Sequence, residues 1–242
     1  MSCFRGLIDF SEIDKQPEVR ALFNETPSEF FAAANLHPDY RKRTTLVTYP
    51  CRNSEVLNVA LLHATRSDQT DTHAWNSDAS HQAVLEVLSD FHPTIQNLVK
   101  LAPDIKVYTL LHRTPLDRLN RGRAIILGDA AALYQPKTSQ GGTIALESAA
   151  ALEHIFAKVD SGQVVQKAEL YNSFVHPHIL TIQLWSDWFP AMGNNEIRQK
   201  LEKLSKKSLP PMDASEFSRP VQDYLYDYNV IEEVKAFLEQ SK

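Results

Sequence analysis

The sequence predicts an α/β (α+β) protein in which a β-sheet region precedes a mostly helical C-terminal half. Before residue 110, two apolar runs rich in β-branched residues, 44–49 and 56–63, favour strands, and a turn-like Pro-Cys-Arg-Asn-Ser segment separates them. After residue 140, apolar residues recur at helical spacing almost to the end of the chain. We expect three regions along the 242 residues, 1–120, 121–160 and 161–242.

The first region reads as a sheet with helical insertions. The two apolar runs predict a hairpin, and residues 105–111 predict a further strand. Between them, Ser80 is suited to cap a helix that begins at His81, and Pro93 is suited to begin a second, short helix.

The remainder of the chain reads as one short strand followed by helices. The strand is expected at Ala124 to Leu127. Asp160-Ser161-Gly162 is typical of a C-terminal helix stop, and Pro177 is expected to kink or split the long helix that contains it. The predicted helices are 140–159, 165–189, 195–207 and 230–238.

The composition argues against several classes of partner. With 25 Lys plus Arg against 30 Asp plus Glu, the net charge of −5 leaves no basic footprint for nucleic acid or an anionic membrane surface. The chain has no apolar run long enough to span a bilayer and no secretory signal pattern at its start, so we expect a soluble, cytoplasmic protein. Cys3 and Cys51 are expected to be reduced thiols, and His176 and His178 flank Pro177 at a spacing that does not favour a metal site.

The segment from Arg121 to Glu153 is the most informative part of the chain. The strand at 124–127 ends at Gly128-Asp129, and after a loop that contains Pro136 a helix begins at Gln140-Gly141-Gly142. A carboxylate at a strand end is suited to accept hydrogen bonds from sugar-like hydroxyls, although a plain helix or turn cap is the alternative. Glycines at the helix start allow the backbone to approach a planar ring, and the free N–H groups there favour negative charge.

This segment resembles the second FAD-contacting motif of single-component flavin monooxygenases, the aromatic hydroxylases that include salicylate hydroxylase-like enzymes of fungal secondary metabolism. The resemblance implies that Gly128-Asp129 holds the ribityl chain of FAD and that the backbone at Gln140, Gly141 and Gly142 faces the N1 and O2 edge of the flavin. It also implies that Pro136 lies against the flavin ring, although a simple turn proline is the alternative. Region 121–160 would then be a remnant of the FAD-binding domain, between a substrate-binding sheet region and a C-terminal helical region.

The resemblance extends over nearly the whole chain. Cys3-Phe4-Arg5-Gly6 is similar to the strand that begins the family's substrate domain, and Leu46 to Pro50 is similar to its Val-x-Tyr-Pro strand. In this family an Arg and a Tyr from these two strands orient a phenolate, and Arg5 and Tyr49 are the matching positions. The alternative is a surface arginine and a core tyrosine. Further similarity is found at Leu170-Tyr171, Ile182-Gln183 and the Tyr224 to Asn229 segment.

The chain also departs from the family pattern. Ala132 stands where the family commonly has His, Ser139 where it has Gly or Ala, and Ser148 where it has Asp, whereas Glu147 is kept. None of the seven glycines forms the G-x-G-x-x-G spacing that holds the ADP half of FAD.

We therefore carry three hypotheses. The first is a monooxygenase that hydroxylates a small aromatic or polyketide-like molecule with FAD, NAD(P)H and O₂. The second is a flavin-free accessory protein, or a cyclase or isomerase, that reuses the substrate pocket. The third is a chain whose N-terminal FAD-binding half is encoded separately.

Overall fold

The computed structural model describes residues 1–24, 31–34, 44–66, 76–187, 195–205, 207–214 and 218–241. The chain divides into two compact units, Met1–Leu110 and Leu111–Lys242, and each is described by itself. This boundary follows Leu110, whereas the sequence placed the first boundary after residue 120. The expected division of the second half at residue 160 remains a prediction.

The first unit is built on a six-stranded antiparallel sheet with the strand order β2-β3-β4-β1-β6-β5. The predicted hairpin is confirmed as β3 and β4, and its turn contains three consecutive residues with left-handed backbone, Arg52, Asn53 and Ser54. The predicted strand at 105–111 is confirmed as β6. The strands are β1 (Ser2–Asp9), β2 (Phe31–Ala34), β3 (Thr45–Cys51), β4 (Val56–His63), β5 (Asn76–Asp78) and β6 (Ile105–Thr109).

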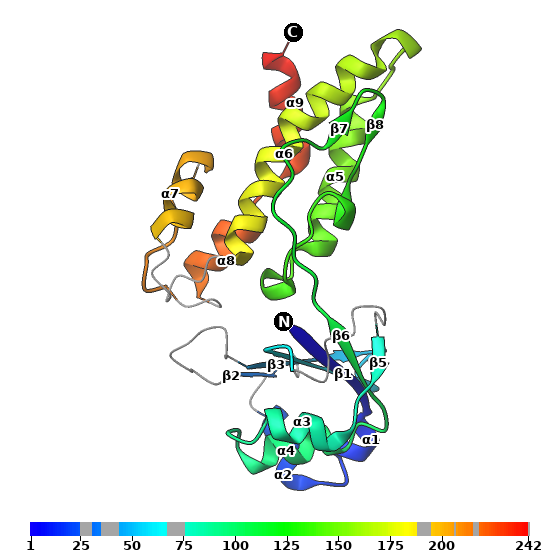
Figure 1. Cartoon of the computed structure of the whole chain (residues 1–242), viewed down its shortest axis with the longest axis vertical. Helices are drawn as coiled ribbons and strands as arrows, with labels where there is room; N and C mark the ends of the chain where they lie inside the picture. The colour runs from blue at the N-terminus through cyan, green and yellow to red at the C-terminus, as the bar shows by residue number, and fades with distance from the viewer. Residues whose placement is uncertain are drawn as a thin grey trace. The chain divides into compact units, whose positions relative to one another are not determined.

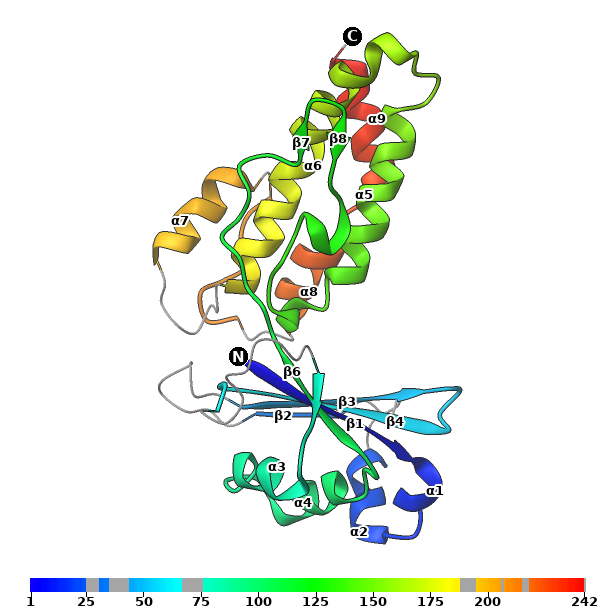
Figure 2. The ribbon, with the colours of Figure 1, turned by 45° about the vertical axis from the view of Figure 1, so that its right-hand side comes forward.

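Helices cover one face of this sheet, as Figure 2 shows for α1 to α4. Their bounds are α1 (Phe10–Ile13), α2 (Pro17–Arg20), α3 (His81–Val87) and α4 (Pro93–Lys100). Both sequence-based helix starts are confirmed: the Ser80 side chain accepts from the backbone N–H of Ala83, and Pro93 is the first residue of α4. Because side chains alternate along a strand, Phe4 and Ile8 enter the core below the sheet while Arg5 faces away from it.

The second unit is mostly helical. In Figure 1 helices α5, α6 and α9 run side by side, and their contacts agree. Their core is formed by residues such as Ile144, Ala151, Tyr171 and Ile179, all at most 2% exposed. The elements are β7 (Asn120–Arg121), β8 (Ala124–Ile125), α5 (Gly141–Ile155), α6 (Val164–Asp187), α7 (Asn195–Leu204), α8 (Arg219–Tyr226) and α9 (Val230–Gln240).

Two expectations for the helices need correction. Pro177 does not split the long helix, because α6 is one helix, Val164–Asp187, although this residue donates no backbone hydrogen bond; the expected kink stays a prediction. The histidines on either side contact other segments: Nε2 of His176 lies 2.6 Å from the Leu116 carbonyl oxygen, and Nε2 of His178 lies 2.8 Å from the Glu147 carboxylate. The Asp160 segment does not end a helix but begins the next one, since Asp160 and Gln163 form a capping box before α6.

Other boundaries differ from those predicted. The strand expected at 124–127 is regular only at Ala124–Ile125. Helix α8 was not predicted, although Pro220 in its first turn is a helix-start signal. Trp188 and Phe189, at the end of the predicted helix 165–189, and Lys206 in 195–207 lie outside the described residues.

The structure also bears on the expectations for membrane-spanning segments and for the two cysteines. Among the described residues, no helix is both long and apolar enough to cross a membrane. Cys3 and Cys51 are both free thiols, as expected, and burial raises the pKa of Cys3 to about 11. The Cys3 thiol therefore stays protonated at neutral pH.

Gly6 permits a close approach between β1 and the chain that follows α4. A β-carbon at this position would lie 3.0 Å from the Ala102 β-carbon and 3.2 Å from the Asp104 carbonyl oxygen. We expect Gly6→Ala to lower the free energy of unfolding by about 1–3 kcal/mol, because the sheet and the covering segment must move apart. Urea unfolding followed by circular dichroism measures this. Gly162→Ala, whose added carbon meets nothing within 4 Å, is the control and should change stability far less.

Candidate functional site

The Gly128-Asp129 turn packs directly on helix α5. It forms a short 3₁₀ turn, Gly128–Ala130, that begins with Gly128 at a φ of +59°, a left-handed conformation that favours glycine. A β-carbon on Gly128 would lie 3.5 Å from the Ala145 β-carbon, so the turn and the helix are in close contact. Asp129 is exposed on this turn.

The same packing brings the Asp129 carboxylate to the start of α5. Oδ1 of Asp129 lies 3.9 Å from the position that a β-carbon on Gly141 would occupy. The first helical bond of α5 is from the Ile144 N–H to the Gln140 carbonyl, at 2.9 Å. Within the described residues, no acceptor pairs with the preceding N–H groups of Gly141, Gly142 and Thr143. The Asp129 carboxylate and the free N–H groups of Gly141, Gly142 and Thr143 therefore lie side by side, and we call this surface the rim.

Gly142 leaves this rim open. A β-carbon there would meet nothing within 4 Å among the described atoms, so its substitution disturbs no internal packing. Ser139, directly before Gln140, has a φ of +53°, although it carries a side chain. A left-handed residue at this point redirects the chain from the Pro136–Thr138 turn into α5.

Distant parts of the second unit hold the loop between the turn and α5. The Ser186 hydroxyl on α6 donates to the Gln135 carbonyl at 2.6 Å, and the Gln183 amide donates to the Leu133 carbonyl at 3.2 Å. Both side chains are almost fully buried. The sequence suggested no role for Ser186, because its partner is a backbone carbonyl about fifty residues away.

The C-terminal segment holds the other end of the loop. The Tyr226 hydroxyl donates to the Thr138 carbonyl at 2.7 Å, and the Gln140 side-chain amide donates to the Leu225 carbonyl at 3.0 Å. Gln140 as a whole is 1% exposed and its side chain is bonded to the interior, so at the start of α5 the accessible residues are Gly141 and Gly142. Pro136 begins the short turn at the exposed side of this loop.

Acidic and aromatic groups cluster behind the rim. The Tyr134 hydroxyl is buried without a hydrogen-bond partner in the described part of the chain, and burial, followed by the charges of Asp129 and Glu147, raises its pKa. Glu147 itself contacts Nε2 of His178 at 2.8 Å, and the His178 ring stacks on Tyr228 with 4.1 Å between ring centroids. These contacts join α5, α6 and the segment before α9.

The two histidines beside Pro177 do not converge. His176 contacts the Leu116 carbonyl, whereas His178 contacts Glu147. Over the residues that the structure describes, no three His, Cys, Asp or Glu side chains are grouped so as to hold a metal ion.

In the first unit, Arg5 and Tyr49 come together on the sheet face that is turned away from the helices. The Arg5 guanidinium donates to the Tyr49 hydroxyl over a long 3.4 Å and to the Asn58 side-chain oxygen at 3.2 Å. It also lies over the Tyr108 ring, 6.0 Å from its centroid. The sequence identified Arg5 and Tyr49, but Asn58 lies within an apolar strand pattern and gave no signal.

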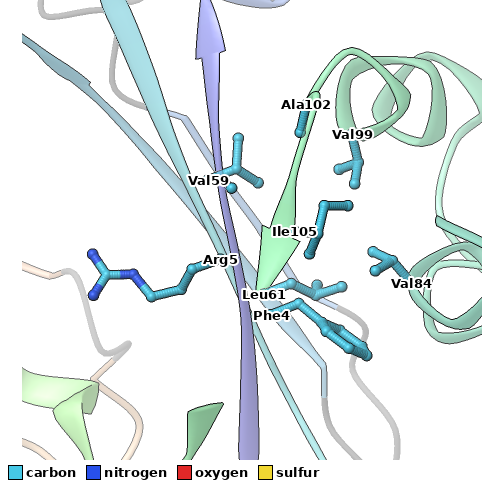
Figure 3. Close-up of a pocket in the computed structure, with 9 residues that line it drawn as sticks. Phe4, Arg5, Val59, Leu61, Val84, Val99, Ala102 and Ile105 are labelled. Carbon is cyan, nitrogen blue, oxygen red and sulfur yellow. The ribbon is translucent and has the colours of Figure 1, made fainter. Parts of the chain in front are cut away.

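The opposite face of β1 borders a small void within the core. Figure 3 shows Arg5 projecting away from the apolar side chains that line this void, which include Phe4, Val99 and Ile105. The space is comparable with a single water molecule. A substrate therefore has no room there, and the polar face of the sheet is the candidate surface in this unit.

Comparisons with known proteins show which proteins this chain is similar to. No protein-family model matches the chain. The FAD-dependent monooxygenase phomE of Diaporthe leptostromiformis is 25% identical over 238 residues, which cover 98% of this chain and 59% of that protein. Hispidin-3-hydroxylase of Neonothopanus nambi is 28% identical over 174 residues, 69% of this chain and 41% of that protein. A 66-residue stretch is 42% identical to 6-hydroxynicotinate 3-monooxygenase of Bordetella bronchiseptica, covering 27% of this chain and 17% of that enzyme.

Solved structures show the same fold. A salicylate hydroxylase in complex with its substrate superposes with a TM-score of 0.74 at 16% identity, covering 98% of this chain and 56% of that one. CtdE, solved with FAD and a substrate, gives a TM-score of 0.73 at 15% identity, covering 99% and 55%. The chain thus spans about half the length of the relatives and structures that it matches. By sequence and by fold, this chain is a homologue of the FAD-dependent monooxygenases, with the mixed α/β fold of the salicylate hydroxylase type.

Proposed function

We propose that this chain supplies the flavin-ring and substrate contacts of an FAD-dependent monooxygenase that hydroxylates a small aromatic or polyketide-like molecule in secondary metabolism. The observation that carries the proposal is the rim formed by the Asp129 carboxylate and the free N–H groups at the start of α5, in a chain whose relatives are FAD-dependent monooxygenases. NAD(P)H is the proposed reductant.

The rim suits a flavin in three respects. Asp129 accepts hydrogen bonds from hydroxyl groups such as those of a ribityl chain. The free N–H groups of Gly141 and Gly142, at the positive end of the α5 dipole, favour the polar and negatively charged edge of a ring. The open space at Gly142 lets a flat ring approach the backbone. When bound, the cofactor supplies redox chemistry and oxygen activation that amino-acid side chains lack.

Arg5 and Tyr49 are proposed to bind the substrate through an acidic oxygen. A guanidinium is permanently charged and a phenol donates one further hydrogen bond, so together they stabilise a phenolate over the neutral phenol. A phenolate ring is richer in electrons at its ring carbons, which favours attack by an electrophilic oxygen. The role of the protein is to hold this anion in one orientation.

A dinucleotide-binding half is a further requirement of the proposal. These 242 residues contain no G-x-G-x-x-G segment for the pyrophosphate of FAD. We propose that a longer chain or a separately encoded N-terminal half supplies it. Because the 242 residues lack this motif, a flavin-free accessory protein, cyclase or isomerase is the alternative. Flavin binding by the chain distinguishes the monooxygenase from this alternative.

The 242-residue chain should bind riboflavin and FAD with similar affinity, because its proposed contacts reach only the ring and the ribityl chain. Asp129→Ala should weaken both by about ten-fold or more, the usual effect of removing a charged hydrogen-bond partner. Quenching of flavin fluorescence in a titration measures both affinities. Asp117→Ala, which removes an exposed carboxylate elsewhere in the same unit, is the matched control. A chain that quenches neither compound would favour the flavin-free alternative.

Gly142→Ala should separate stability from flavin binding. Nothing lies within 4 Å of the added carbon, and alanine is the better helix former, so the free energy of unfolding should stay level or rise by up to about 1 kcal/mol. Flavin affinity should nevertheless fall, because the ring can no longer approach the backbone as closely. Thermal unfolding and the same fluorescence titration give the two values. Unchanged flavin affinity in the variant would argue against a ring at this position.

Co-expression with a dinucleotide-binding half from a related monooxygenase tests the complete activity. The complex should be yellow and should oxidise NAD(P)H faster when a phenolic substrate is added. Arg5→Met should keep the colour but lower substrate-dependent product formation by about a hundred-fold, because the phenolate loses its charged partner. Product formation that is insensitive to Arg5 would contradict the proposed substrate site.

A further inference from the structure

Ser139 has an unfavourable backbone conformation just before the start of α5. Its φ of +53° and ψ of +24° lie in the left-handed region, where a β-carbon crowds the backbone. Glycine adopts this conformation freely, whereas serine keeps it only where the surrounding structure enforces it. Contacts on the two sides of Ser139 must therefore hold the chain in this shape.

Two neighbouring residues at the end of α8 bond to the chain on either side of Ser139. Before it, the Thr138 carbonyl accepts from the Tyr226 hydroxyl at 2.7 Å. After it, the Gln140 side-chain amide donates to the Leu225 carbonyl at 3.0 Å. Leu225 is buried in the helical core, so the end of α8 is a fixed support for both bonds. We call these two bonds the α8 clamp.

The bond from Tyr226 acts on the peptide group whose orientation depends on Ser139. The Thr138 carbonyl belongs to the planar peptide group that precedes Ser139, and a return of φ to a negative value would swing this group away from Tyr226. The Thr138 side chain adds no other polar anchor, because its buried hydroxyl has no hydrogen-bond partner in the described part of the chain. Burial raises the pKa of Tyr226, so its hydroxyl keeps the donated proton at neutral pH.

The conformation of Ser139 also sets the direction of the free N–H groups that follow it. Gln140 is the next residue, and its carbonyl accepts the first bond of α5 from the Ile144 N–H at 2.9 Å. Gly141 and Gly142, whose N–H groups are free, come directly after it. A different conformation at Ser139 would turn this whole start of the helix. Donors that are already held in one orientation lose less conformational entropy when a ligand binds.

We propose that Tyr226 is a positioning residue for flavin binding. Through the α8 clamp it holds Ser139 in the left-handed conformation, and the start of α5 therefore presents its N–H groups to the flavin in one orientation. Tyr226 acts through the loop and not by contact with the flavin. This inference rests on the proposed function, because it assumes that the rim binds a flavin ring.

The first variant, Tyr226→Phe, removes the hydroxyl and keeps the ring. Tyr226 is 46% exposed, so the core should stay intact. Without the bond to Thr138, the loop at Ser139 should relax and the first turn of α5 should open more often. Hydrogen exchange of the Ile144 amide, followed by NMR, should become about five-fold faster. Riboflavin affinity, from fluorescence quenching, should fall by about the same factor.

A second substitution separates positioning from a general structural role. Because glycine adopts the left-handed conformation without cost, adding Ser139→Gly to Tyr226→Phe should return both values to within about two-fold of the wild type. Loss of general stability would not be repaired in this way. Lys158→Gly, which relieves a left-handed residue with a φ of +55° beyond the other end of α5, should rescue neither value.

Tyr224→Phe is the matched control for the lost hydroxyl. Tyr224 lies on the same helix, but its hydroxyl donates to Ser205 at 3.0 Å and not to the loop. Exchange of the Ile144 amide and riboflavin affinity should both stay within about two-fold of the wild type in this variant.

Three results would overturn the proposal. One is a Tyr226→Phe variant in which the Ile144 amide exchanges at the wild-type rate. Another is a double variant with Ser139→Gly that exchanges as fast as Tyr226→Phe alone. The third is unchanged riboflavin affinity in Tyr226→Phe despite faster exchange. The exchange measurement needs no flavin, so a wild type that binds no riboflavin but shows the expected loss and rescue would refute the flavin function and keep the α8 clamp.

Discussion

The contact between the Gly128 turn and helix α5 is the constraint on which the candidate cofactor rim depends. Gly128 adopts a left-handed conformation and its bare α-carbon packs close to Ala145, which brings the Asp129 carboxylate to the first turn of the helix. The two halves of the rim are thus set by backbone packing rather than by a hydrogen bond between them. Any other residue at position 128 would be strained in this left-handed conformation, even with Asp129 and Gly142 unchanged.

The loop that completes this rim has little structure of its own. Its carbonyl groups are held by Gln183 and Ser186 from the long helix and by Tyr226 from the C-terminal segment. The carboxylate of Glu147 pairs with the ring of His178, and both side chains are partly buried. The helical half therefore supports the loop backbone, and the side chains of Gln183, Ser186 and Tyr226 are bonded to the protein itself. Side chains that hold the loop and backbone N–H groups that stay free are what we expect of a site that contacts its ligand mainly through the main chain.

In the other unit, strand register produces the candidate substrate surface. Antiparallel pairing places Asn58 opposite Tyr49, and alternation along β1 turns Arg5 to the same face while Phe4 enters the core. The sheet thus separates an apolar face, which is needed for folding, from a polar face. Arg5, Tyr49 and Asn58 are joined by hydrogen bonds on the polar face.

Local signals in the sequence determined the hairpin, the Ser80 and Pro93 helix starts, the Gly128-Asp129 turn and the glycine-rich beginning of α5, because each depends on residues a few positions apart. They failed at Pro177 in that α6 is not split there, and at Asp160, which forms a cap for the following helix instead of ending the preceding one. Only the tertiary structure decided that Asp129 reaches α5, that the Gln140 side chain faces inward, and that Asn58 joins Arg5. Those outcomes depend on packing and register between segments that are distant in the chain, and local patterns carry no information about such pairings.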